Sequence, residues 1–96
     1  MTIYISGGIT NNPDYINDFA NAEQEVKNNL SDARIINPAR LNSALPKLEW
    51  KEYMIVCIDL LEIADAIYMV SGWKDSAGAC VEYGHALGKD KVIINA

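Results

Sequence analysis

One acidic residue stands out because its neighbours along the chain are nearly all apolar or small. Glu82 lies in the run Gly78-Ala79-Cys80-Val81-Glu82-Tyr83-Gly84, which follows an apolar segment and a polar loop. A carboxylate buried among such residues loses its hydration, and proteins seldom keep one there without a use. Glu82 is therefore the leading candidate for a catalytic residue. The alternative is a solvated acid on an amphipathic helix.

Ser76 stands six residues before Glu82, where a helix is predicted to begin. The free N–H groups and the positive dipole end of such a helix favour a phosphate or carboxylate, and the Ser76 hydroxyl adds a donor. Six helical residues span about 9 Å. This spacing suits one ligand with an anionic end at Ser76 and a reacting carbon at Glu82. Ser76 could also serve only as the helix cap.

The elements that must position these residues alternate between strands and helices. We expect strands at residues 3–5, 33–36, 66–70 and 92–94, and helices at residues 13–30, 48–64 and 77–87. With right-handed crossovers, this order predicts one α/β domain over residues 1–96. The expected architecture is a doubly wound, flavodoxin-like or Rossmann-like sheet of four parallel strands in the order 2-1-3-4, with helices on both faces.

Two loops should meet at the carboxyl edge of that sheet, where such folds bind ligands. One contains Gly7 and Gly8, which permit positive φ or a close approach of the backbone, and the other is residues 71–77. A glycine pair alone is not a dinucleotide fingerprint, and no acidic ribose partner follows the second strand. We therefore expect no nicotinamide cofactor and no other cofactor.

The composition limits the partners. The 96 residues are 50% hydrophobic and carry a net charge of -5, with scattered Lys and Arg. This pattern argues against a nucleic acid polymer or an anionic membrane surface and favours a small molecule. No apolar run reaches the length of a membrane span.

Cys80 and the single histidine, His85, are candidates for a nucleophile pair, and His85 is also a candidate metal ligand. Cys57 and Cys80 lie among apolar residues of predicted helices, which indicates buried, reduced thiols and a cytoplasmic location. His85 follows Glu82 by three residues but lacks the ligand cluster of a zinc site, and it is poorly placed to activate Cys80. We expect no metal site.

Three segments together carry a family resemblance: Ile3-Tyr4-Ile5-Ser6-Gly7-Gly8-Ile9; Asp59-Leu60 with Ala64-Asp65-Ala66; and Ser76-Ala77-Gly78 with Glu82-Tyr83-Gly84-His85-Ala86. On these motifs, nearly the whole chain resembles the nucleoside 2-deoxyribosyltransferase-like superfamily. That superfamily includes deoxyribosyltransferases and nucleoside 5'-monophosphate N-glycosidases. Gly72-Trp73 and Ser76-Ala77-Gly78-Ala79 are also similar to short bacterial and phage proteins of unassigned function.

The resemblance implies cleavage of an N-glycosidic bond. Glu82 matches a nucleophile that attacks the anomeric carbon of a nucleoside, and water or another base then resolves the glycosyl-enzyme. Asp59 matches an aspartate that handles a proton near the base, and Tyr4 matches a tyrosine that orients the nucleophile. At the position of Ser76, the transferases carry an acid and the monophosphate glycosidases carry a phosphate-binding serine.

The departures from the family pattern support a second hypothesis. Gly8 stands where the monophosphate glycosidases have a serine, and Thr10 stands where they have an arginine, so a weaker phosphate site is expected. The family enzymes also continue beyond the point matching Ala96 into a segment that helps complete a neighbouring subunit's site. The alternative function is a catalytically inactive module that senses or sequesters a nucleotide. A structural domain without any ligand is the third possibility.

The remaining candidate residues have ordinary roles beside their functional ones. Asp59 shares a helix face with Glu52 and Glu62, and such a charged stripe is usually just solvated. Tyr4 could pack within a strand, and Trp73 could cover the sheet edge or stack on a nucleobase. The expected substrate-binding residues are Gly7, Gly8, Ser76, Gly78 and Trp73.

Self-association is also expected. The short sheet leaves the apolar side chains of Tyr53, Met54 and Val56 with little of the same chain to cover them. Exposed apolar faces of this kind mark contacts with other proteins, so we expect a homo-oligomer.

Overall fold

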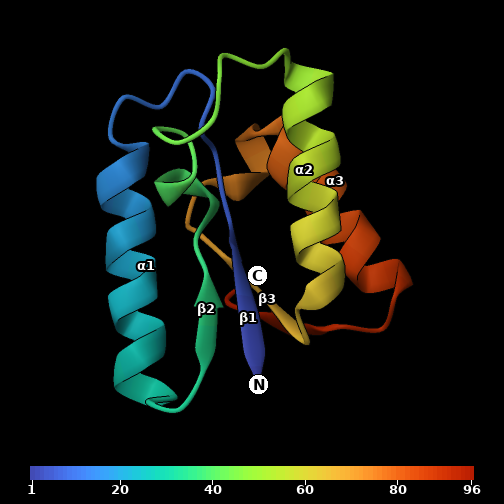
Figure 1. The fold of residues 1–96 in the computed structure, drawn as a ribbon. Coiled ribbons are helices and arrows are strands. Elements are labelled where there is room, and N and C mark those ends of the chain that lie inside the picture. Colours follow the sequence, from blue (N-terminus) through green and yellow to red (C-terminus); the bar gives the residue numbers. More distant parts are fainter.

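The computed structural model describes all residues 1–96 and contains one parallel sheet with the strand order β2-β1-β3-β4. The predicted fold class and strand order are confirmed (Figure 1). The elements are β1 (Thr2–Ser6), α1 (Tyr15–Asn29), β2 (Arg34–Ile36), the 3-10 helix η1 (Pro38–Arg40), α2 (Trp50–Ile63), β3 (Ala66–Met69), the 3-10 helix η2 (Trp73–Asp75), α3 (Ala77–Gly88) and β4 (Val92–Ile94).

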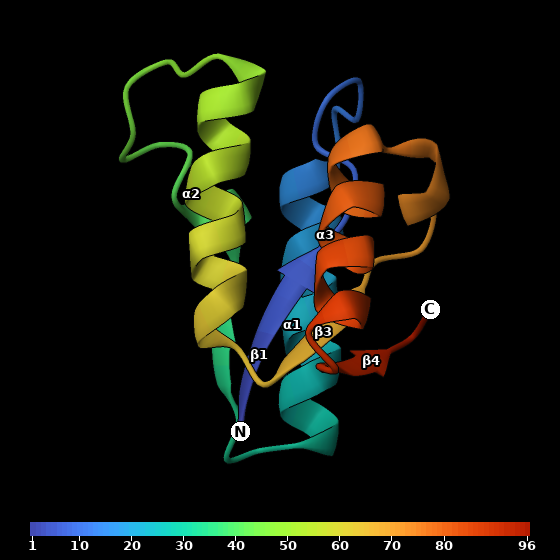
Figure 2. The same ribbon diagram turned by 90° about the vertical axis from the view of Figure 1, so that its right-hand side faces the viewer.

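The helices divide between the two faces of the sheet. Helix α1 covers one face, whereas α2 and α3 lie side by side on the other (Figures 1 and 2). The topology requires this division, because the chain steps in one direction from β1 to β2 and in the opposite direction from β2 to β3. Right-handed crossovers then place the first helix opposite the other two.

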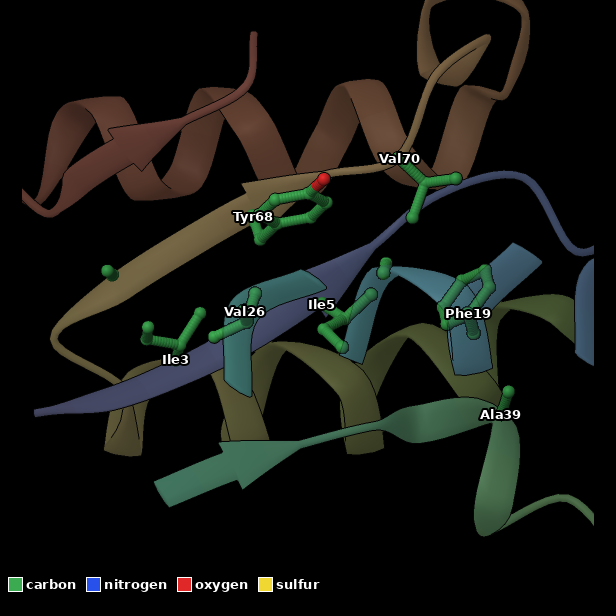
Figure 3. Close-up of a cluster of buried hydrophobic side chains, with 9 residues drawn as sticks. Ile3, Ile5, Phe19, Val26, Ala39, Tyr68 and Val70 are labelled. Carbon is green, nitrogen blue, oxygen red and sulfur yellow. The ribbon is translucent and has the colours of Figure 1, made fainter. Parts of the chain in front are cut away.

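The buried strand β1 supplies side chains to both layers of the core. Ile3 and Ile5 pack with Phe19 and Val26 of α1 (Figure 3). Successive residues of a strand point to opposite faces, so Tyr4 and Ser6 point towards α2 and α3. Tyr4 accordingly belongs to the second apolar cluster. This alternation decides which side chains of β1 can reach the predicted site.

The element boundaries differ from the predicted ones by up to two residues. Helix α1 begins at Tyr15 rather than at Pro13, because Asn12 caps a preceding turn: its Oδ1 accepts from the Asp14 N–H, and its carbonyl oxygen accepts from the Tyr15 N–H. Helix α2 begins two residues later than predicted, behind a capping box formed by Glu49 and Glu52.

The prediction of two buried thiols is correct for Cys57 and wrong for Cys80. Cys57 is buried, but Cys80 is exposed in the first turn of α3. Its sulfur lies 3.5 Å from the Lys74 carbonyl oxygen, which keeps it at the surface of the preceding loop. His85 contacts Glu62 of α2 instead of Cys80, so His85 and Cys80 do not form a nucleophile pair.

The apolar face of α2 that we expected to be exposed is partly covered by the rest of the chain. Tyr53, Met54 and Val56 are all half-buried, not exposed. The most exposed apolar side chains of this helix are instead Ile55 and Ile63. None of the helices is both long and apolar enough to span a bilayer.

Gly7 is required by close packing and not by backbone conformation. Neither Gly7 nor Gly8 has a positive φ, although the sequence left that possibility open. A Cβ at position 7 would lie 2.7 Å from the Cβ of Val70 and 3.2 Å from the Phe19 ring. At position 8 it would lie 3.5 Å from the Cβ of Ser76, which is an ordinary contact.

We therefore expect Gly7→Ala to lower the free energy of unfolding by about 1–3 kcal/mol, because the added methyl overpacks the junction between β1 and β3. Gly8→Ala should change it by less than about 0.5 kcal/mol. Urea unfolding of both variants measures the difference. Equal stabilities would contradict this account of Gly7.

Candidate active site

The structure brings Glu82 together with two side chains that lie more than 70 residues before it in the sequence. Glu82 of α3 is buried, and each of its carboxylate oxygens accepts a hydrogen bond from β1. The Tyr4 hydroxyl donates to Oε2 at 2.6 Å, and the Ser6 hydroxyl donates to Oε1 at 2.6 Å. Because Tyr4 and Ser6 are two residues apart on one strand, they point to the same side and hold the carboxylate from both ends.

Glu82 has no cationic partner, which separates it from the other buried acid. Glu23 on α1 is also buried, but it forms ion pairs with Lys27 and Arg40 and accepts a hydrogen bond from Asn37. That network has the charge compensation expected of a structural acid. Glu82 receives only two neutral hydroxyl groups, so the protein leaves its charge uncompensated.

The pKa values reflect this difference. Burial raises the pKa of Glu82 above its ordinary value of 4.5, and the hydrogen bonds from Ser6 and Tyr4 offset part of that increase. For Glu23, burial acts in the same direction, but the hydrogen bonds from Lys27 and Asn37 and the charge of Arg40 bring its pKa below the ordinary value. Burial and the nearby Glu82 carboxylate raise the pKa of Tyr4, which keeps its hydroxyl protonated as a donor.

Glu82 lies in the wall of a cavity of about 300 Å³ at the carboxyl edge of the sheet. Such a volume is at the lower end of the range for sites that bind small molecules. The lining comes from β1 and the loop after it, α1, η1, α2, the end of η2, and the start of α3. The lining residues are Tyr4, Gly7, Ile9, Thr10, Asn11, Phe19, Pro38, Trp50, Tyr53, Met54, Cys57, Asp75, Ser76, Ala77, Gly78, Ala79 and Glu82.

The start of α3 presents hydrogen-bond donors to this cavity. Ser76 is the N-cap, and its Oγ accepts from the Ala79 N–H at 3.2 Å, so its predicted capping role is confirmed. The N–H groups of Ala77 and Gly78 have no acceptor within the protein, as expected for the first turn of a helix. These donors and the Ser76 hydroxyl can bind an oxygen-rich part of a ligand.

Five of the predicted site residues line this cavity and three do not. Tyr4, Gly7, Ser76, Gly78 and Glu82 are brought together. Gly8 lies just outside, beside Ser76.

The other two residues lie elsewhere. Trp73 stacks on Tyr83 with ring centroids 4.6 Å apart, and it packs against the apolar cluster between the sheet and α2 and α3. Asp59 is exposed on α2 and does not line the cavity, so a single chain gives its carboxylate no contact with a ligand beside Glu82.

Sequence reasoning missed several residues of the site. Ser6 was part of a motif but had no assigned role, although strand alternation from Tyr4 could have identified it. Cys57 and Tyr53 come from the buried side of α2, where the sequence predicts an apolar face and, for Cys57, a buried thiol, but no place in the site. Asp75, beside Ser76, also lines the cavity as its second acid. Burial raises the pKa of the Cys57 thiol, which disfavours a reactive thiolate.

No group of three or more His, Cys, Asp and Glu side chains is arranged to hold a metal ion. The groups that the site presents are a buried carboxylate, two hydroxyl donors, and the amide groups at the start of α3. A carboxylate with this environment can act as a nucleophile or as a base.

Together, the fold and the site define a doubly wound α/β domain with a buried, unpaired carboxylate in its ligand cavity. The chain belongs to the family described as a domain of unknown function, DUF4406, whose model matches residues 1–95. A comparison with curated proteins found no match. The family assignment covers nearly the whole chain and gives no activity, so the function must be argued from the site.

The pKa of Glu82 should respond to its two donors. We expect Ser6→Ala and Tyr4→Phe each to raise this pKa further, because each removes a hydrogen bond that stabilises the carboxylate. A pH titration of the Glu82 side-chain carboxyl carbon by NMR measures the shift in each variant. A pKa at or below 4.5 in the unaltered protein, or a fall in the variants, would contradict the described environment.

The same pKa has a consequence for stability. A carboxyl group whose pKa is higher in the folded than in the unfolded state binds its proton more tightly when folded, so stability is lost as the pH rises through the folded-state pKa. Glu82→Gln cannot ionise, and we expect it to be more stable than the unaltered protein at pH 7. Thermal unfolding should show this difference shrinking towards pH 4. If Glu82→Gln is instead less stable than the unaltered protein at pH 7 and equally stable at pH 4, the raised pKa of Glu82 is contradicted.

Proposed function

We propose that this protein cleaves the N-glycosidic bond of a nucleoside or nucleoside 5'-monophosphate, or transfers the sugar to another base. The observation that carries the proposal is the carboxylate of Glu82, which is buried in the wall of a small-molecule cavity without a cation. A carboxylate with reduced hydration is a stronger nucleophile than a solvated one. The motifs that resemble deoxyribosyltransferases and monophosphate N-glycosidases support the choice of bond.

The proposed reaction has two displacements. A Glu82 oxygen attacks the anomeric carbon, the carbon–nitrogen bond breaks, and its electron pair leaves with the base, which takes up a proton. Water then attacks the same carbon, the bond to Glu82 breaks, and the water proton is released. If a nitrogen of a second base replaces water, the sugar is transferred. Two displacements retain the configuration at the anomeric carbon.

Tyr4 and Ser6 are positioned to orient the nucleophile. Their hydroxyls hold the two oxygens of the Glu82 carboxylate in place. Because Tyr4 stays protonated, it continues to donate when the carboxylate is ionised. The two residues therefore hold one Glu82 oxygen ready for attack and stabilise the carboxylate when it is released.

The start of α3 is the proposed site for the sugar and its 5' substituent. The free N–H groups of Ala77 and Gly78 and the Ser76 hydroxyl supply donors for a phosphate or for sugar oxygens. Asp75 beside them is an acceptor that suits a sugar hydroxyl and repels a phosphate. Nucleosides and their monophosphates are therefore both proposed as substrates.

Asp59 is the proposed proton donor, but it does not line the cavity of its own chain. Its carboxylate is exposed on α2 and would have to act in another chain's cavity. This position also favours the second proposal, a module of the same fold that binds a nucleotide without turnover. Asp59→Asn separates the possibilities, since a loss of base release in this exposed variant would require action between chains.

We expect the purified protein to release free base from at least one common ribonucleoside or deoxyribonucleoside, or from its 5'-monophosphate. Liquid chromatography after overnight incubation measures the release. Glu82→Gln and Glu82→Ala should reduce it at least about 100-fold, because the covalent route is lost.

Glu25→Gln is the matched control for that loss. Glu25 also accepts a hydrogen bond from a tyrosine, Tyr68, at 2.7 Å, but it does not line the cavity. Its variant should keep full activity. Undiminished release by both Glu82 variants would end the assignment of the nucleophile. Tight nucleotide binding in calorimetry without any release would favour the binding module.

We also propose that the protein is cytoplasmic and that it self-associates. The free thiols of Cys57 and Cys80 are consistent with a cytoplasmic location. Self-association is proposed through exposed apolar side chains such as Ile55 and Ile63 of α2. Light scattering that gives a monomer mass at working concentration would contradict the second proposal.

A further inference from the structure

A second cavity adjoins the one that contains Glu82. It has a volume of about 320 Å³ and extends from the β1 loop to the segment before α2. Ile9, Thr10, Trp50 and Tyr53 line both cavities. These four residues therefore form the boundary between the cavity of the reacting carboxylate and a second space, which the proposed sugar site does not use.

Tyr53, at the boundary between the two cavities, carries a polar atom that has no hydrogen-bond partner. Its hydroxyl oxygen is buried and is the only buried side-chain oxygen or nitrogen in the protein without a hydrogen-bond partner. Burial, and after it the neighbouring Cys57 thiol, raise the pKa of Tyr53, but the thiol does not complete a hydrogen bond of ordinary geometry with the hydroxyl. Buried hydroxyls are normally paired, so an orphan in a cavity wall calls for a partner that the protein does not supply.

Trp50 adds an aromatic surface to the same boundary between the two cavities. It is 52% exposed at the first residue of α2, although a large indole is usually more buried. Its Nε1 lies 3.7 Å from the position that a Cβ on Gly78 would take, so the indole lies beside the start of α3. An exposed indole at the edge of a cavity can stack on a planar ring.

We infer that Tyr53 and Trp50 form the subsite for the departing base, with the Tyr53 hydroxyl hydrogen-bonded to a ring nitrogen or an exocyclic group of that base. This inference rests on the proposed function, because the sugar is assigned to Glu82 and to the start of α3. The other walls of the cavity include Ile9, Trp50 and Tyr53 on the side that adjoins the second cavity, and we place the departing base against them. The second cavity provides room beyond them.

Tyr53→Phe tests the inference, because it removes only the orphan hydroxyl. We expect kcat/KM for nucleoside or nucleotide substrates to fall roughly tenfold, the effect of losing one hydrogen bond. For a 4-nitrophenyl glycoside of the same sugar, which lacks a base, kcat/KM should change less than about twofold. The Tm should be equal or higher, since no hydrogen bond within the protein is lost. A merely structural hydroxyl would lower the Tm and affect both substrates.

Tyr83→Phe is the matched control, because Tyr83 lies outside both cavities and stacks on Trp73. It should leave both substrates unaffected. An equal loss on both substrates in Tyr53→Phe, or no loss on either, would overturn the inference.

Binding of free bases separates this inference from the proposed function. Calorimetric titration with adenine, guanine, cytosine, thymine and uracil needs no turnover. In one outcome, the unaltered protein releases no base from any substrate and still binds one of these free bases. If the Tyr53→Phe variant then binds that base more weakly, the proposed function fails and the subsite stands. If no base binds and Tyr53→Phe changes no catalytic rate, the subsite is wrong.

Discussion

The hydrogen bonds from Tyr4 and Ser6 to Glu82 are the interaction on which the site depends. They join the first strand to the last helix and fix the carboxylate in the wall of the cavity. The period of two along β1 makes this possible, since the alternate residues Ile3 and Ile5 are committed to the core under α1. One five-residue strand thus anchors an apolar layer with one set of side chains and the acid with the other.

The protein accepts a cost in stability at this position. Glu23 shows that the same fold can compensate a buried acid fully, with a lysine, an arginine and an asparagine around it. Glu82 has neutral donors only, and burial raises its pKa. Groups left in such an unfavourable state are characteristic of functional sites, where reactivity is retained at the expense of stability. The orphan hydroxyl of Tyr53, a residue that lines the same cavity, follows the same pattern.

Much of the architecture could be predicted from local signals. The apolar run before Ser71, the proline after β2 and the cap at Ser76 indicate parallel strands and the start of α3, and the strand order follows from crossover rules. Glu82 was identifiable because its apolar neighbours predict burial. The charged stripe of Asp59 with Glu52 and Glu62 already indicated that Asp59 is solvated, but the α2 residues that reach the cavity depend on how this helix is rotated against the sheet. Tyr53 and Cys57 look like ordinary core residues until that rotation is known.

The pH dependence of base release tests the central claim most directly. If the ionised carboxylate of Glu82 is the reacting group, kcat/KM of the unaltered protein should rise with pH to a plateau. Its midpoint should lie above 4.5 and coincide with the Glu82 pKa measured by NMR in the free protein. A rate that does not change across that pKa, or no base release at any pH, would contradict the account.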